Sequence, residues 1–385
     1  MSCPRCHEAA RCKGFRPRRV VSLLGVVRLQ RHYYYCPCCG QGHCPQDERL
    51  GLLSHDLTPA ADEVACLAGV QASFAEAAQK VLPRLAALHV AESTVERATE
   101  AAGQRVGAAS AAGQTFGQGR DWSWHKDAEG KTVAYVSADL TGVGQQGPHG
   151  GAAEGRMAAV AMIYNPVPED RRQWAKPRGP RPPWQARYLA GVQPLAGLGE
   201  PLRRQGAQVG MDRAQRWIAL SDGGSGLEDF FRQNFPRVEA VICDFFHVCE
   251  YLGELATLWH PGREEAAETW RRAWCQRLKA EGGAAVLRAL RELDLRGRPP
   301  AARECHARVV TYFENQQHRM DYPEYVRKGW QIGSGPVESA CKTVVGQRLK
   351  GAGMRWSEAG ADSLCHLRAL FKSEAGQWAG FWSRN

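Results

Sequence analysis

Residues 216–244, RWIALSDGGSGLEDFFRQNFPRVEAVICD, contain two short apolar runs on either side of a segment with helical periodicity. The apolar runs Arg216–Ser221 and Val238–Cys243 predict buried strands, and Leu227–Asn234 predicts the helix that connects them. An aspartate follows each strand, Asp222 after the first and Asp244 after the second. This β-α-β pattern predicts an α/β fold class in which two strands end in carboxylates.

Three more strands are predicted upstream of this unit. Residues 131–138, with TVAYVSA at their centre, form a β-branched and aromatic run that ends at Asp139. Apolar runs at 157–164 and 187–190 are expected to pair with it as an antiparallel meander. We therefore expect a mixed sheet in which Asp139 and Asp222 lie at the carboxyl ends of neighbouring strands.

An acidic residue that would join Asp139 and Asp222 as a third ligand follows much later in the chain. Residues 332–339, IGSGPVES, indicate a glycine loop that leads into a helix, with Pro336 at the first helical position and Glu338 near the helix start. Carboxylates are preferred ligands of Mg²⁺, and two such ions between three carboxylates support phosphodiester cleavage or strand transfer. Turn formation and helix capping explain the same acidic residues without a metal, and both interpretations stay open here.

The amino-terminal region has the cysteine spacing of a zinc site. Two Cys-x-x-Cys pairs, Cys3 with Cys6 and Cys36 with Cys39, predict two tight turns that present four thiolates to one structural Zn²⁺. Between the pairs, runs rich in valine, leucine and tyrosine predict the short strands of a zinc ribbon, at residues 18–29 and 31–35.

Other residues near these pairs leave the exact ligand set open. Cys38 is expected to be a spectator, because Cys36 and Cys39 keep the two-residue gap. Cys12, His43 and Cys44 are alternative ligands, and a cluster of reduced thiols without metal is the alternative to a zinc site.

Residues 60–103 have apolar residues at helical spacing and predict three helices. Ser73 is expected to cap the second helix, and Ser93 with Glu96 forms a capping box at the start of the third. Such a module suits a helix-turn-helix whose third helix enters a DNA groove. A three-helix packing module without DNA contact fits the same pattern.

Residues 247–325 are almost entirely compatible with helix and predict an all-α insertion between Asp244 and Glu338. We expect its tryptophans, Trp259, Trp270 and Trp274, to be core residues, because bulky aromatic side chains are buried in most helical domains. His247, at the start of this segment, is as readily a packed histidine as a functional donor.

The composition describes a folded and basic protein. Its 385 residues predict two or three compact units, and 44% hydrophobic with 23% charged residues excludes collagen-like and strongly disordered classes. A formal net charge of +10 favours a polyanionic partner, and residues 1–50, with nine Lys/Arg against three Asp/Glu, are the expected contact. Residues 171–187 hold six Lys/Arg and no acid, which predicts an extended basic loop, either a DNA contact or a solvated linker.

Localisation is predicted from two features of the sequence. No run approaches the roughly 18 apolar residues of a membrane span. Seven of the 14 cysteines lie within the first 44 residues of a large chain, which favours metal binding over secreted disulfides. We therefore expect a cytoplasmic protein without a membrane partner.

Several motifs follow one another along almost the whole chain. They are the two Cys-x-x-Cys turns, Asp139-Leu140-Thr141-Gly142, Ser221-Asp222-Gly223, Asp244-Phe245-Phe246-His247, IGSGPVES at 332–339, Arg348-Leu349-Lys350 and Gly353-Met354-Arg355-Trp356-Ser357. In this order and separation they resemble bacterial insertion-sequence transposases of the ISKra type. The segment from IGSGPVES to Gly353-Met354-Arg355-Trp356-Ser357 is the most specific part of the likeness.

The resemblance implies a ribonuclease H-like core with an aspartate-aspartate-glutamate triad. In this chain the triad corresponds to Asp139, Asp222 and Glu338, which would hold Mg²⁺ or Mn²⁺. The resemblance also implies a distant link to Mutator-type transposases, whose D-x-x-H element corresponds here to the auxiliary residues Asp244 and His247.

Two positions depart from the family pattern. Leu140 stands where a glycine follows the first aspartate in the family, and Gly224 stands where alanine is commoner. A leucine in place of that glycine removes backbone freedom beside the expected metal site.

The expected domain organisation combines these observations. A zinc ribbon occupies residues 1–50, a helical DNA-binding module 51–110, and the first part of the ribonuclease H-like core 128–246. The all-α insertion follows at 247–325, and the end of the core, with Glu338 and the last helices, at 326–385.

The expected function is that of a DNA transposase that cleaves the ends of an insertion sequence and transfers them to target DNA. Basic side chains that follow Glu338 are expected to contact DNA phosphates; they are Lys342, Arg348, Lys350 and Arg355. Lys342 can instead pair with Glu338 one turn before it. We expect a homo-oligomer on DNA, associated with the bacterial nucleoid. A nuclease without strand transfer and an inactive, zinc-containing DNA-binding protein derived from a transposase are the alternatives.

Overall fold

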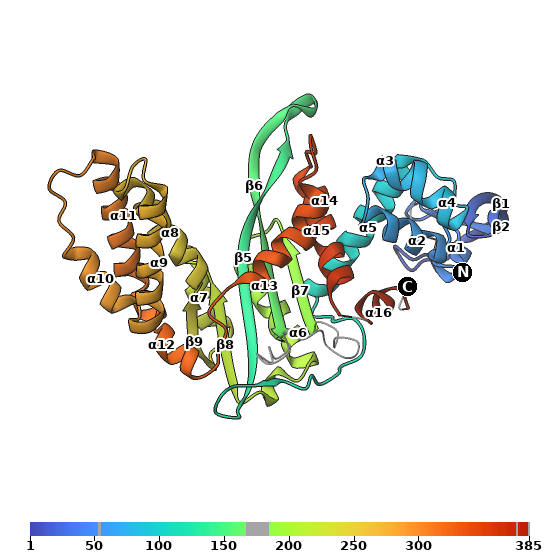
Figure 1. The fold of residues 1–385 in the computed structure, drawn as a ribbon. Helices are drawn as coiled ribbons and strands as arrows, with labels where there is room; N and C mark the ends of the chain where they lie inside the picture. Colours follow the sequence, from blue (N-terminus) through green and yellow to red (C-terminus); the bar gives the residue numbers. More distant parts are fainter. Residues whose placement is uncertain (53–54, 167–184, 375, 384–385) are drawn as a thin grey trace. The chain divides into compact units, whose positions relative to one another are not determined.

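The computed structural model (Figure 1) describes residues 1–52, 55–166, 185–374 and 376–383. The chain divides into two compact units. Unit 1 comprises Met1–Gly117, Trp356–Phe371 and Ala375–Asn385, and unit 2 comprises Gln118–Arg355 and Lys372–Glu374. This division differs from the expected assignment of residues 326–385 to the core, because most of residues 356–385 belong to unit 1.

Unit 1 begins with a three-stranded antiparallel sheet. β1 (Arg11–Ser22) and β2 (Gly25–Tyr35) form a long two-stranded ribbon, and β3 (Gly42–His43) pairs with the end of β2. The boundaries expected at 18–29 and 31–35 are wrong, because the chain turns at residues 23–24. Gly25 has a φ of +110° there, which favours glycine, and the Ser22 hydroxyl donates a hydrogen bond to the Gly25 carbonyl oxygen across the turn.

Helices make up most of the rest of unit 1. They are α1 (Pro45–Arg49), α2 (Pro59–Gly69), α3 (Phe74–Glu76), α4 (Leu82–Ala86), α5 (Glu92–Ala111), α15 (Glu358–Lys372) and α16 (Gln377–Trp382). A π-helical turn at Ala77–Val81 joins α3 to α4, so residues 60–103 contain three helical segments as expected. α5 and α15 approach each other closely at Gly103, where a Cβ atom would lie 2.0 Å from the Ser363 carbonyl oxygen.

One of the two predicted helix caps is present. The Ser73 hydroxyl accepts a hydrogen bond from the Glu76 N–H, at 3.2 Å, and caps α3. The capping box of Ser93 and Glu96 is wrong, because α5 begins before Ser93 and Ala91 is its N-cap residue. Ser93 therefore lies inside the first turn, where its side chain is not at the capping position.

A six-stranded mixed sheet forms the centre of unit 2 (Figure 1). Its strands are β4 (His125–Lys126), β5 (Thr132–Gln146), β6 (Ala152–Asn165), β7 (Gln185–Gly191), β8 (Arg216–Ser221) and β9 (Val238–Cys243). The order is β7-β6-β5-β8-β9, and β4 pairs with β5. β5, β6 and β7 are antiparallel, whereas β5, β8 and β9 are parallel. The predicted meander and β-α-β unit are both confirmed.

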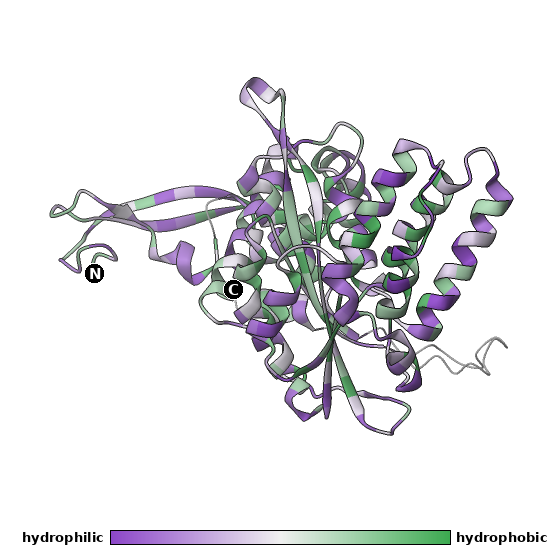
Figure 2. Cartoon of the chain, turned by 90° about the vertical axis from the view of Figure 1, so that its left-hand side faces the viewer, coloured by the Kyte–Doolittle hydropathy of each residue, from purple (hydrophilic) through white to green (hydrophobic). Residues whose placement is uncertain are grey.

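The two faces of this sheet have different neighbours. Helices α6 (Gly199–Gln208) and α7 (Leu227–Asn234) pack their apolar residues against Ala134, Val136 and Ala138 of β5 and their neighbours. Figure 2 shows the hydrophobic colouring of the central strands. Because side chains alternate along a strand, Asp139 projects from the opposite face of β5. That face is contacted by α13 (Gly335–Ala340).

The predicted all-α insertion is confirmed. Its helices are α8 (Phe245–Trp259), α9 (Glu264–Glu281), α10 (Gly283–Arg291), α11 (Pro300–Gln316) and α12 (Tyr322–Arg327). Trp259 is buried as expected. Trp270 and Trp274 are only partly buried; their rings stack on each other along α9, with centroids 4.7 Å apart. Among the helices of the described residues, none has both the length and the apolar character needed to cross a membrane.

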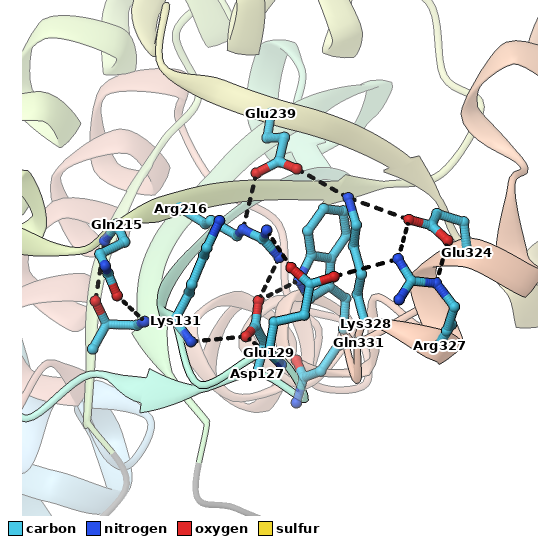
Figure 3. A network of polar contacts seen from close by, with 12 residues as sticks. Asp127, Glu129, Lys131, Gln215, Arg216, Glu239, Glu324, Arg327, Lys328 and Gln331 are labelled. Atoms are coloured by element: carbon cyan, nitrogen blue, oxygen red, sulfur yellow. Dashed lines mark hydrogen bonds and ion pairs between the residues drawn. The ribbon is translucent and has the colours of Figure 1, made fainter.

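A polar network fixes the end of the unit 2 sheet where β8 and β9 begin (Figure 3). Arg216, the first residue of β8, forms ion pairs with Asp127, Glu129 and Glu239. The indole N–H of Trp330 donates to Asp127 at 3.2 Å. Burial by itself would raise the pKa of Asp127, but hydrogen bonds from backbone N–H groups and Trp330, together with the Arg216 charge, lower it overall. The network therefore ties the segment that leads to α13 to the sheet.

Candidate functional site

Four cysteine thiols gather near the amino terminus of unit 1. The Sγ atoms of Cys3, Cys6, Cys36 and Cys39 all lie within 4.8 Å of one another. Cys3 Sγ is 3.6 Å from Cys39 Sγ, and Cys6 Sγ is 3.5 Å from Cys36 Sγ. Zn²⁺ binds four thiolates at about 2.3 Å, which places neighbouring sulfur atoms roughly 3.8 Å apart. The predicted cysteines therefore form one cluster that can hold a metal ion such as zinc.

The two cysteine turns have the same backbone geometry. His7 and Gly40 each follow the second cysteine of a pair, and their φ angles are +63° and +70°. Their N–H groups donate to the carbonyl oxygens of Cys3 and Cys36, both at 3.0 Å. The Arg5 N–H also points at Cys3 Sγ, at 3.4 Å, and such a donor favours the thiolate form that binds metal.

The alternative ligands have other neighbours. Cys12 Sγ lies 3.9 Å from His32 Nδ1, and the His43 ring stacks on Tyr34 with centroids 5.8 Å apart. Cys38 is exposed. Within the described residues, the thiol cluster consists of the two Cys-x-x-Cys pairs alone.

In unit 2, Asp139 does not lie at a strand tip, because β5 continues to Gln146. The expectation of a strand end at this residue is therefore wrong. β8 pairs with β5 only up to Ser137, which lies opposite Leu220. Asp139 and Asp222 each follow these paired residues by two positions, so the parallel register places them next to each other where β8 ends.

The backbone at Asp222 is held by residues of the helical insertion. Asp222 Oδ1 accepts a hydrogen bond from the Gly224 N–H at 2.8 Å. Arg319 is buried and donates to the Asp222 carbonyl oxygen at 3.2 Å. The Tyr312 ring packs directly on Gly223, where a Cβ atom would lie 2.5 Å from the ring. These contacts fix the turn that presents the Asp222 carboxylate.

Glu338 lies on the first turns of α13, next to β5. Pro336 is the second residue of α13, one position later in the helix than predicted. Cys341 follows Glu338 by about one helical turn, and its thiol donates to Asp139 Oδ2 at 3.5 Å. Since residues one turn apart share a helix face, Glu338 and Cys341 project from the same side of this helical segment.

The pKa of Asp139 reflects its burial and its acidic neighbours. Burial raises the pKa of Asp139, and the charges of Asp222 and Glu338 raise it further, while a hydrogen bond from the Leu140 N–H opposes the shift. Within the described residues, these three carboxylates do not lie within 4.8 Å of one another as the four thiols do. The three predicted acids thus lie in the same region of unit 2, but their carboxylates are not as close to one another as the ligands of a single metal ion would be.

Asp244 is completely buried and links the insertion to the Glu338 loop. Its Oδ1 atom accepts a hydrogen bond from the His247 N–H at 2.9 Å, which caps α8. Its Oδ2 atom accepts from both the N–H and the hydroxyl of Ser334. The Ser334 hydroxyl also lies 3.1 Å from Glu338 Oε1. Asp244 therefore positions Ser334 beside Glu338, and the single proton of the Ser334 hydroxyl can be donated to only one of the two carboxylates at a time.

His247 is placed apart from these hydrogen bonds. Its side chain is 35% exposed, and its Nδ1 atom lies 3.3 Å from Glu250 Oε2. Its ring packs edge-on against Tyr251. His247 thus takes part in the Asp244 contact through its backbone, not through its imidazole.

The predicted DNA contacts are divided between the surface and the core. Lys342, Lys350 and Arg355 are exposed. The Lys350 ammonium donates to the Thr141 hydroxyl, and the Arg355 guanidinium donates to the Gly150 carbonyl oxygen at 3.2 Å.

Both of these contacts lie on the part of the β5–β6 hairpin that extends beyond Asp139. Arg348 is different, because it is only 2% exposed. Lys342 forms no ion pair with Glu338 among the described residues, so the alternative pairing is absent.

Sequence reasoning missed three residues of this site. Ser334 and Cys341 contact the predicted acids directly, and Arg319 binds the backbone at Asp222. The sequence could have indicated that Cys341 lies on the same helix face as Glu338, because the two residues are about one helical turn apart. No sequence pattern indicates the contact of Arg319, since it depends on how the insertion folds back on β8.

The predicted basic loop at 171–187 lies mostly outside the described residues. Its last residue, Arg187, belongs to β7 and is 1% exposed. The Arg187 guanidinium pairs with Glu374 at 2.7 Å, so this arginine is a structural residue of unit 2.

Comparisons with known proteins add no family assignment. No protein-family model matches the sequence, and a search among curated proteins finds no relative.

Proposed function

We propose that the chain is a DNA transposase of the insertion-sequence type, with a ribonuclease H-like core in unit 2. The observation that carries this proposal is the meeting of three acids from distant parts of the sequence. Asp139 and Asp222 are adjacent in the parallel register, and Asp139 is in contact with Cys341, one turn from Glu338. Burial raises the pKa of Asp139, and the charges of Asp222 and Glu338 add to this shift; a divalent cation would relieve both effects.

Asp139, Asp222 and Glu338 would hold Mg²⁺ or Mn²⁺, since their donor set is made of carboxylate oxygens. When bound, such ions activate the attacking oxygen and stabilise the leaving oxygen of a phosphodiester displacement. In the proposed reaction a water molecule attacks the phosphorus at an element end, and the bond to the 3′ oxygen breaks. The released 3′-hydroxyl then attacks a phosphorus of target DNA, without a covalent intermediate on the protein.

The neighbouring side chains of this chain orient the acids. The Cys341 thiol donates to Asp139 Oδ2, and the Gly224 N–H donates to Asp222 Oδ1. Ser334, which Asp244 holds in place, lies within hydrogen-bonding distance of Glu338. The hydrogen bonds from Cys341 and Gly224 favour one orientation of the Asp139 and Asp222 carboxylates before DNA arrives.

The exposed cations near the acids would bind the DNA backbone. Lys350 and Arg355 lie along the β5–β6 extension, and Lys342 lies one turn after Glu338. We propose that unit 1, with a structural Zn²⁺ on its four cysteines, binds the ends of the element. The active complex would be a homo-oligomer on nucleoid DNA.

The second candidate is an inactive, zinc-containing DNA-binding protein derived from a transposase. Leu140 favours it, because a leucine at the position that is glycine in the family restricts the backbone next to Asp139.

Strand joining distinguishes the two functions. Labelled DNA ends, taken from inverted repeats that flank the coding region, are incubated with a plasmid target and Mg²⁺ or Mn²⁺. We expect joined product from the wild type and from Glu304→Gln, which changes an exposed residue of α11. We expect no cleavage by Glu338→Gln, because an amide carries no charge for a divalent ion, while its DNA affinity stays at the wild-type level.

The other outcomes also decide between the candidates. Equal loss of cleavage and DNA binding in Glu338→Gln contradicts the metal role of this residue. Cleavage without joining identifies a nuclease. DNA binding without any cleavage, under both metals, identifies an inactive protein.

A further inference from the structure

The β1–β2 ribbon has one face that packs on the rest of unit 1. Val20 is completely buried on this face. Arg18 and Arg31 both form ion pairs with Asp47 of α1, and Arg16 lies over the Tyr33 ring at 3.9 Å. The cations of this inner face therefore have structural partners.

The opposite face of the ribbon is exposed. Antiparallel register places four cross-strand pairs on it, because residues directly opposite each other share a face. The pairs are Phe15 with His32, Pro17 with Gln30, Arg19 with Arg28, and Val21 with Val26. Phe15 is 62% exposed and Val26 54% exposed, and both arginines are exposed. The Phe15 and His32 rings are in contact, with centroids 4.2 Å apart.

Two like charges stand directly opposite each other in the middle of this face. Cross-strand Cβ atoms are about 5 Å apart, and like charges at that distance destabilise a sheet. Arg19 and Arg28 form no ion pair among the described residues, and residues 11–35 contain no Asp or Glu. The ribbon thus keeps a charge arrangement that costs stability and that an external anion would relieve.

The tip of the ribbon is apolar and exposed. Leu24 is fully exposed and Leu23 40% exposed, and Val26 follows them on the outer face. A cationic centre between an apolar tip and an aromatic pair is unlike an ordinary solvated surface, where charges of both signs alternate.

The geometry points to the major groove of duplex DNA as the partner of this outer face. Two strands lie about 4.8 Å apart, and a two-stranded ribbon fits the roughly 12 Å width of that groove. Arg19 and Arg28 then lie near phosphates or guanine edges, and the apolar tip meets thymine methyl groups. The major groove of an RNA duplex is too narrow for such a ribbon.

The inference rests on the proposed function only in taking DNA as the partner.

Full-length protein is titrated into a fluorescein-labelled DNA duplex of about 21 base pairs, or two helical turns, at several salt concentrations. The test variant is Arg19→Gln with Arg28→Gln. The control is Arg288→Gln with Arg303→Gln, which removes the same charge from exposed positions of the helical insertion.

We expect weaker DNA binding by the ribbon variant and a salt dependence whose log–log slope falls by roughly 1.8, about 0.9 for each lost phosphate contact. The control keeps the wild-type slope. The melting temperature of the ribbon variant should equal or exceed that of the wild type, because the substitution removes a repulsion. A purely structural role of these arginines would lower it instead.

Three results would overturn the inference. They are an unchanged slope in the ribbon variant, an equal loss in the control, and an equal effect on an RNA duplex of the same sequence. Strand joining is not measured in this titration. If the wild-type protein binds DNA through the ribbon but forms no joined product in the strand-joining assay, the proposed transposase function is contradicted. The inference about the ribbon is then still supported.

Discussion

Asp244 is a buried carboxylate whose hydrogen bonds join two distant segments of unit 2. Three donors converge on it, namely the His247 N–H and both the N–H and the hydroxyl of Ser334. Several hydrogen bonds to one buried acceptor stabilise the fold together, because removing the acceptor leaves all of their buried donors without a partner. At the residue scale, this set determines where the loop before Glu338 lies.

Replacing Asp244 with asparagine should destabilise unit 2. The amide keeps one acceptor oxygen but turns an NH₂ group toward donors, so we expect a loss of about 2 kcal/mol in the free energy of unfolding. Urea denaturation measures this loss. Ser334→Ala is the partner variant, and a double-mutant cycle should give a coupling energy of roughly 1 kcal/mol. Additive effects of the two substitutions would show that they do not share this contact.

At the scale of elements, the cysteine turns and the ribbon have almost no apolar core of their own. Only Cys3, Ala10 and Cys36 are buried in this cluster, and Cys6, Tyr34 and Cys39 pack against them. So small a core does not hold two turns together without further bonds, and metal coordination supplies that stability in many small modules.

The purified protein should contain one zinc ion per chain. Cys39→Ser removes one ligand, so elemental analysis should find the zinc content strongly reduced after dialysis. Cys38→Ser is the matched control, because Cys38 is the exposed neighbour of that ligand, and it should retain the metal. Zinc-free wild-type protein, prepared without chelator, would rule out the zinc site.

The polar network at the start of β8 makes unit 2 sensitive to acid. Folding lowers the pKa of Asp127 below its ordinary value of 3.8. The folded protein therefore binds this proton less readily than the unfolded chain. The stabilisation by ionised Asp127 is therefore fully present above the unfolded-state pKa of 3.8. It is lost as the pH falls through the lower pKa that Asp127 has in the folded state.

Asp127→Asn should reduce this loss of stability on acidification. It should also cost about 2 kcal/mol at neutral pH, because the Asp127 side chain is buried between Arg216 and Trp330. Urea denaturation at a series of pH values measures both effects. Asp229→Asn, an exposed change on α7, serves as the control. An unchanged pH dependence in Asp127→Asn would contradict the assigned role.

At the scale of the whole molecule, the carboxyl-terminal helices complete the unit that begins the chain. Arg368 of α15 is buried and donates to the Val70 carbonyl oxygen. Gln377 of α16 donates to the Phe116 carbonyl oxygen at 2.6 Å. Unit 1 therefore cannot form fully from residues 1–117 alone, although these residues include its ribbon and its first helices.

Deletion of residues 356–385 should unfold the helical part of unit 1 and leave the metal cluster intact. The reason is that α5 loses the helix it packs against at Gly103, whereas the four cysteines lie within the retained residues. Hydrogen exchange should show faster exchange in α5, with zinc content unchanged. Protection of α5 at the wild-type level would contradict this division of the chain.

Local patterns were sufficient for several parts of the molecule. The Cys-x-x-Cys spacing predicts the thiol cluster, because a tight turn brings residues three apart into contact. The β-α-β unit at 216–244 has the predicted boundaries, since apolar runs and an amphipathic helix are signals contained within a few residues. The sequence also predicts the all-α insertion, again from local periodicity.

Other features depend on partners that are distant in the sequence. β5 continues beyond Asp139 because β6 pairs with it as far as Gln146, and Arg348 is buried by packing that no local pattern reports. The capping box at Ser93 was a plausible local signal, yet the helix begins earlier.

Local sequence patterns predicted the β-α-β unit, the cysteine turns and the helical insertion. The contacts of Asp244 with Ser334 and of Cys341 with Asp139, and the membership of α15 and α16 in unit 1, are visible only in the folded chain. The physical reason is that these contacts join segments far apart in the chain, whose encounter depends on how the sheet and helices pack and not on any local preference.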